Sequence, residues 1–137
     1  MNEYVEYLKG LGTDKLSHSG RSLLDHLIGV SNLLKENGRD EVDQAAGLFH
    51  SIYGTEYYKH SEKLEITRPE IINLIGPDAE FLVWLFCKTE RRTIRILEDD
   101  WFDEPERTSL RWIEYCNLIE QKYDNEFVYQ LKEKVNG

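Results

Sequence analysis

Apolar side chains recur at intervals of three and four residues along most of the chain, and capping or breaking residues separate one such stretch from the next. This period is typical of amphipathic α-helices that bury one face in a core. The stretches lie at 2–9, 23–36, 40–53, 67–75, 78–97, 106–123 and from 125 onward. With 137 residues, the chain is long enough to bury one core without disulfides. The sequence therefore predicts an all-α protein, a single compact bundle of six to seven helices over residues 1–137.

Capping signals fix where two of these helices start. Ser22, with Asp25 three residues later, resembles a capping box and starts the helix predicted at 23–36. Asp40 gives the next helix a similar start. On the wheel of the first of these helices, His26 lies at the flank of the apolar stripe and Asp25 points away from it. The helical wheel therefore predicts that His26, and not Asp25, is the buried side chain.

The composition and the net charge limit the classes of partner that we expect the protein to bind. The net charge of −9 opposes the binding of nucleic acid, which depends on clustered Lys and Arg. No apolar run approaches the length of a membrane span, and the first residues lack the pattern of a secretory signal. Cys87 and Cys116 have no metal-binding spacing, which favours reduced thiols. We expect a cytoplasmic protein that binds a small molecule, binds neither nucleic acid nor membrane, and is compatible with a homodimer.

Three of the four histidines lie between residues 18 and 56, in or beside two of the predicted helices. His18 lies in a predicted loop, His26 on the first long helix and His50 in the last turn of the next. The residues one turn before His50 are small, so a neighbouring helix can approach it closely. Two histidines with one or two carboxylates form the ligand set of hydrolytic zinc and non-haem iron sites. The alternative for each histidine is a hydrogen-bonded, partly buried imidazole.

Two glutamates are candidate carboxylate ligands. Glu56 follows the second histidine-bearing helix, in the segment YGTE. Glu90 falls in the middle of the apolar face of the helix predicted at 78–97. Because a glutamate is almost never buried without a partner, Glu90 either meets a cation, or the helix bends or ends earlier.

The segments HSGRSLLDHL and AGLFHSIYGTE, with an inward carboxylate later in the chain, resemble the HD-domain superfamily over residues 16–97. They are also similar to bacterial HD-like proteins with an HSxYGTE signature. The resemblance implies a helical fold with a divalent metal, Mn, Fe, Zn or Ni. Ser51 stands where HD proteins carry the aspartate of the His-Asp pair. The metal ligands implied are His18, His26, His50, Glu56 and Glu90, and the catalytic residues are His50, Glu56 and Arg21.

Three functions are compatible with these residues. The first is a metal-dependent hydrolase that acts on a small molecule, including phosphorylated ones, with a metal-activated water. The second is an iron oxygenase of the HD-related type. The third is a non-catalytic domain that binds a small molecule or a protein, with the histidines as hydrogen-bonding residues of a pocket. The fork of Arg21 is suited to a substrate phosphate or carboxylate, and a salt bridge to Asp14 or Asp25 is the alternative.

Overall fold

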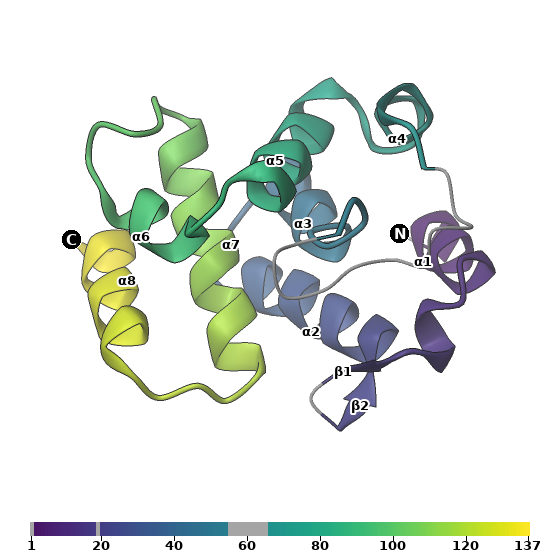
Figure 1. The fold of residues 1–137 in the computed structure, drawn as a ribbon, viewed down its shortest axis with the longest axis horizontal. Coiled ribbons are helices and arrows are strands. Elements are labelled where there is room, and N and C mark those ends of the chain that lie inside the picture. The colour runs from purple at the N-terminus through teal and green to yellow at the C-terminus, as the bar shows by residue number, and fades with distance from the viewer. Residues whose placement is uncertain (1, 19, 55–65) are drawn as a thin grey trace.

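A computed structural model describes residues 2–18, 20–54 and 66–137 of the chain and confirms the all-α prediction (Figure 1). In chain order the elements are α1 (Asn2–Gly10), the 3-10 turn η1 (Thr13–Lys15), β1 (Ser17–His18), β2 (Arg21–Ser22), α2 (Leu23–Glu36), α3 (Glu41–Leu48), α4 (Arg68–Ile75), α5 (Pro77–Lys88), α6 (Arg92–Leu97), α7 (Glu106–Glu120) and α8 (Glu126–Asn136). None of the described helices is long and apolar enough to cross a membrane.

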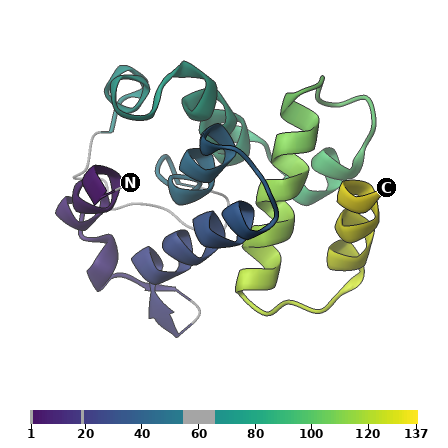
Figure 2. The same cartoon turned by 180° about the vertical axis from the view of Figure 1, so that it is seen from behind.

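Helix α2 lies at the centre of the packing, against α3 on one side and α7 on the other. Figures 1 and 2 show α1 and α4 at one end of the molecule and α6 and α8 at the other, with the two termini at opposite ends. The core is built from fully buried side chains of these helices and of the turn after α3: Leu23, Leu27, Leu34, Phe49, Phe86, Leu110 and Ile113. The helices that pack against α2, which carries His26, therefore come from distant parts of the chain.

Both predicted caps are present. The hydroxyl of Ser22 accepts a hydrogen bond from the backbone N–H of Asp25 at 3.0 Å, and the carboxylate of Asp40 accepts one from Asp43 at 3.0 Å. His26 is buried and Asp25 is exposed, as the wheel predicted. The local signals of α2 thus place His26 correctly.

The prediction of one helix over 78–97 is wrong, because α5 ends at Lys88 and α6 begins at Arg92. Thr89 has extended backbone angles and Arg91 has the left-handed φ of 53°. The break turns the chain so that the Arg92 side chain is buried, whereas Glu90 is exposed. The inward position expected for Glu90 is therefore corrected. The break also raises the number of helices among the described residues to eight.

Smaller differences concern element ends. The loop predicted at 13–20 leads into a short antiparallel hairpin, in which Ser17 pairs with Ser22 and His18 with Arg21. Helix α3 ends at Leu48, so His50 lies in the turn that follows it rather than inside the helix. Backbone pairing in the hairpin holds His18 beside the start of α2.

Candidate functional site

The structure brings the three predicted histidines together in one row. The ring centroids of His18 and His26 are 4.5 Å apart, and those of His26 and His50 are 5.2 Å apart. The ring of Phe86 follows at 5.2 Å from His50. A hairpin strand, helix α2 and the turn after α3 each supply one histidine, so the row depends on the packing of α2 against α3.

The three histidines line a cavity of about 290 Å³. Its remaining wall comes mainly from α5 to α8 and consists of Leu23, Ser51, Phe86, Arg92, Thr93, Glu114, Asn117, Leu118, Gln121, Tyr123, Asn125 and Phe127. Its volume is at the low end of the range for ligand pockets, roughly 300–1,000 Å³. A mixture of apolar walls and a few converging polar groups is typical of a small-molecule site.

His26 is held by two oxygen acceptors. Its Nδ1 lies 2.6 Å from Glu120 Oε1 and its Nε2 lies 2.9 Å from Asn117 Oδ1. The orientation of the Asn117 amide is fixed because its Nδ2 donates to Glu114 Oε1 at 2.9 Å. Both ring nitrogens of His26 are thus engaged by oxygen atoms of α7, which fixes the orientation of the ring.

Gly29 makes room for this arrangement. A Cβ atom at Gly29 would lie 2.5 Å from Glu120 Oε2 and 2.9 Å from Glu120 Cγ. The missing side chain thus lets Glu120 lie across α2 and reach His26. Arg21 from β2 pairs with the same carboxylate, rather than with Asp14 or Asp25, the alternatives expected from the sequence.

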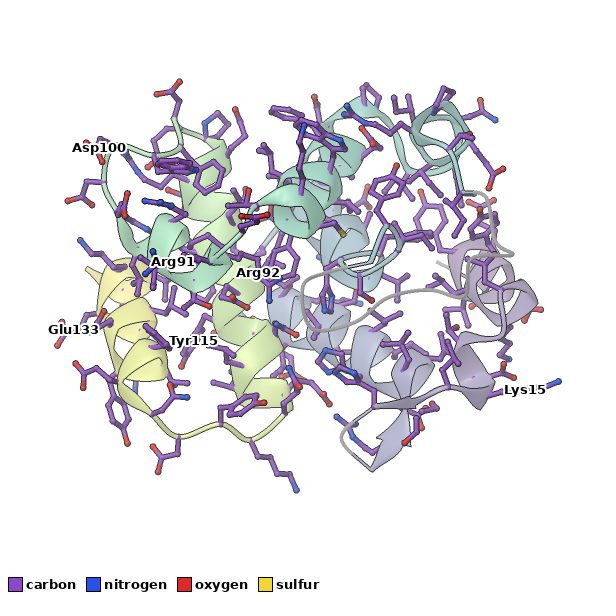
Figure 3. The ribbon with its side chains drawn as sticks, viewed as in Figure 1. Lys15, Arg91, Arg92, Asp100, Tyr115 and Glu133 are labelled. Atoms are coloured by element: carbon purple, nitrogen blue, oxygen red, sulfur yellow. The ribbon has the colours of Figure 1, made fainter. Side chains whose placement is uncertain are left out.

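A second ion pair, between Arg92 and Glu114, lies at the end of the network opposite Glu120. Arg92 Nε donates to Glu114 Oε2 at 3.0 Å, and Thr93 Oγ1 donates to the same oxygen at 2.7 Å. Burial raises the pKa of Glu114, but the charge of Arg92 and the hydrogen bonds from Asn117 and Thr93 outweigh it, so the pKa is lowered overall. Figure 3 shows Arg92 toward the middle of the molecule beside α7. The carboxylate is thus kept ionised in the core.

His50 is held as a neutral imidazole. It is 4% exposed, and burial together with the positive charge of His26 lowers its pKa well below the usual value. Its Nδ1 donates to the backbone carbonyl of Gly47 at 2.6 Å. A neutral imidazole with its proton on Nδ1 carries a lone pair on Nε2. His50 is therefore fixed as a base or a ligand nitrogen in the wall of the cavity.

His18 also lacks a charge at neutral pH. Burial, followed by the charge of His26, lowers its pKa, and its Nε2 is buried with no hydrogen-bond partner within the described part of the chain. An unpaired buried nitrogen costs free energy. A bound ligand in the cavity would remove that cost.

The expected metal ligands are only partly brought together. Glu90 lies in the exposed turn between α5 and α6 and lines a different groove, beside Trp84 and Trp101. Glu56 lies outside the described residues. Among residues 2–18, 20–54 and 66–137, no three or more His, Cys, Asp or Glu side chains are grouped so as to hold a metal ion. The metal thus stays a prediction.

Several residues of the cavity and its network were not predicted as site residues from the sequence. Glu114 and Asn117 of α7 and Gln121 just after it have the spacing i, i+3, i+7, and Gln121 donates to Asn117 Oδ1 at 3.2 Å. A polar stripe at helical spacing on an otherwise apolar helix was the available signal. Arg92 and Glu120 gave no local signal, because their partners lie 22 and 94 residues away.

Comparison with known proteins identifies the family to which the chain belongs. No curated protein and no solved structure matches the chain. The family described as Domain of unknown function (DUF6817) matches residues 7–91. This match spans more than half of the chain and includes all three histidines of the row. The chain belongs to the DUF6817 family.

Proposed function

We propose that the cavity is the active site of a small-molecule hydrolase in which His50 is the general base. The observation that carries this proposal is the hydrogen bond from His50 Nδ1 to the Gly47 carbonyl. It fixes the tautomer and leaves the lone pair of Nε2 to accept a proton. A buried imidazole that donates from one ring nitrogen and keeps the lone pair of the other is suited to act as a general base.

The reaction uses one water molecule. Nε2 of His50 takes a proton as the water oxygen attacks an electrophilic carbon or phosphorus atom, and it returns that proton to the leaving group. The His26 ring lies beside His50, with 5.2 Å between the ring centroids, and Glu120 and Asn117 hold it in place. This part of the cavity wall therefore needs little reorganisation during the reaction.

A metal-dependent form of the same hydrolase is the second candidate. A metal-binding histidine usually donates its other ring nitrogen to a carbonyl or carboxylate, as His50 does to Gly47. His18 Nε2 adds a nitrogen with no partner in the described chain. Both nitrogens of His26 are engaged by oxygen acceptors, so a further ligand would have to come from elsewhere, with Glu56 as the expected source.

The test is turnover of nitrophenyl esters of short carboxylic acids and of phosphate, with and without EDTA. Wild type is expected to turn over at least one ester, and His50→Gln is expected to lose about 100-fold or more while retaining a cooperative thermal transition. Asp25→Asn, at an exposed position of α2 that does not line the cavity, is the control and keeps wild-type activity.

Four outcomes separate the candidates. Activity that survives EDTA supports His50 as the base, and activity that is lost with EDTA and restored by one metal supports the second candidate. Equal rates in wild type and His50→Gln would sink the assignment of His50. If no ester or phosphate is turned over, the cavity is a binding site without this hydrolytic activity.

A further inference from the structure

A second groove lies between the end of α5, the start of α6 and the segment that joins α6 to α7. We call it the tryptophan groove, because Trp84 and Trp101 line it, together with Phe102. Phe102 is buried, whereas Trp101 is 51% exposed. Tryptophan is enriched where proteins meet, and one side chain can bury roughly 150–250 Å². Among the described residues, this groove and the histidine cavity have no lining residue in common, so the groove is a separate candidate for binding.

The segment that carries Trp101 is fixed to α7. The buried Arg111 donates from Nε to the Ile96 carbonyl at 2.9 Å and from Nη2 to the Asp99 carboxylate at 3.0 Å. The Arg95 guanidinium lies over the Trp101 ring, 4.1 Å from its centroid. A side chain whose position is already fixed loses little conformational entropy on binding. The exposed ring is therefore held ready for contact with a partner.

Charged side chains of both signs lie around the tryptophan groove. Lys88 and Arg91 line it, whereas Asp100 and Asp103 are the sequence neighbours of the aromatic pair at its edge. Figure 3 shows Arg91 beside the start of α6 and Asp100 at the outer edge of the segment that follows α6. All four side chains are exposed, and none of them forms an ion pair within residues 2–18, 20–54 and 66–137. Their charges are therefore open to a partner.

The two sets of charge restrict what can occupy the groove. An anionic occupant is repelled by Asp100 and Asp103, and a cationic occupant is repelled by Lys88 and Arg91. A second copy of the same face carries both signs, and a twofold axis makes each pair of facing residues occur twice. We infer that the tryptophan groove is a contact between two copies of this chain. Arg91 of each copy faces Asp100 of the other, and the Trp101 rings are buried between them.

This contact is expected to be weak. One large exposed ring per copy places it at the low end of interface sizes, below about 1,200 Å² in total. The net charge of −9 on each copy opposes association, but at 0.15 M salt the screening length is about 8 Å, so the charges next to the contact have the larger effect. We expect a dissociation constant on the order of 10–100 µM. The inference does not depend on the proposed hydrolase, because the histidine cavity lies outside the contact.

The test is sedimentation velocity of the full chain over a concentration series that spans this range. The wild type is expected to shift from monomer toward dimer as the concentration rises. Trp101→Ala, Arg91→Glu and Asp100→Arg are each expected to weaken the dimer about tenfold or more, and each keeps the wild-type thermal transition because these side chains are exposed. Lys15→Glu is the control, because it changes the net charge as Arg91→Glu does but lies at the opposite end of the molecule from Asp100 (Figure 3). It leaves the dimer unchanged.

A mixture of the two charge variants tests the twofold pairing directly. Arg91→Glu and Asp100→Arg are each expected to stay monomeric alone, because like charges face each other twice in either dimer. In an equimolar mixture both facing pairs join opposite charges, so dimer returns. A wild type that is monomeric at every concentration would overturn the inference and leave the groove to a segment of a different protein. A dimer that Trp101→Ala leaves unchanged, equal weakening by Lys15→Glu and Arg91→Glu, or no dimer in the mixture would each overturn it as well.

Discussion

Gly29→Ala is the substitution whose effect depends most directly on the geometry of the site. Gly29 lies in the middle of α2, where alanine is the better helix former by about 1 kcal/mol. A Cβ atom there would lie 2.5 Å from Glu120 Oε2, so the Glu120 side chain must leave its position. The charge-assisted hydrogen bond to His26 would then be lost, at a cost of roughly 1.5–3 kcal/mol. We expect Gly29→Ala to lower the free energy of unfolding by about 0.5–2 kcal/mol.

The assay is urea unfolding of four proteins: wild type, Gly29→Ala, Glu120→Ala and the double variant. Without the Glu120 carboxylate nothing opposes the new methyl group, so Gly29→Ala should stabilise the Glu120→Ala background by about 1 kcal/mol. The sign of the effect is therefore expected to reverse. Gly10→Ala is the matched control, because Gly10 is helical and a Cβ there meets no atom within 4 Å. Stabilisation by the same amount in both backgrounds would refute the placement of Glu120 over Gly29.

Three further predictions concern other parts of the network and its surroundings. The pKa of the Glu114 carboxyl is lowered from its ordinary 4.5, so the ionised carboxylate stabilises the fold fully above about pH 4.5, and this stabilisation is lost as the pH falls through the folded-state pKa. Glu114→Gln should therefore lower the free energy of unfolding by about 3 kcal/mol at pH 7. Urea unfolding at falling pH should show the difference between wild type and Glu114→Gln shrinking below about pH 4.5. Helix α7 ends in a Schellman motif, in which the N–H of Tyr123 donates to the Leu118 carbonyl and that of Lys122 to the Ile119 carbonyl. Lys122→Gly should stabilise the protein by about 0.5–1 kcal/mol, because Lys122 adopts a left-handed φ of 63°, which is strained for a lysine; a lower melting temperature would contradict the Schellman assignment. Glu90→Gln should change stability by no more than about 0.5 kcal/mol, like Glu98→Gln, because both side chains are at least partly exposed; a much larger loss in thermal unfolding at Glu90 alone would restore its inward position.

The parts of the fold that could be predicted from the sequence depend on short-range interactions. The Ser22 cap joins atoms three residues apart, and the burial of His26 follows from the helical period of α2. The break between α5 and α6 was only one of two readings of Glu90 on the apolar face, the other being a bound cation, and residues 89–91 contain no Gly or Pro that would mark the break. The break is stabilised by a tertiary interaction, because it places Arg92 against Glu114, which lies 22 residues away in the sequence.

The candidate site likewise has one part that could be predicted from the sequence and one part that could not. The histidine row was foreseen because α2 and α3 are consecutive helices, joined by a short connection that favours antiparallel packing. The groups that hold the His26 ring were not foreseen, because Asn117 and Glu120 lie 91 and 94 residues from His26. A polar stripe on α7 is compatible with a solvent-facing edge until the partner helix is known.

Helix α7 therefore couples the stability of the fold to the chemistry of the site. Its apolar face buries Leu110 and Ile113 in the core, and the next turns of the same helix present Asn117 and Glu120 to His26. A shift of α7 that disturbs the core also withdraws the oxygen atoms that hold the His26 ring. Displacement of that ring would change the wall of the cavity beside His50. Activity changes caused by substitutions in α7 consequently have to be compared with the free energy of unfolding of the same variants before a residue is assigned a direct part in the reaction.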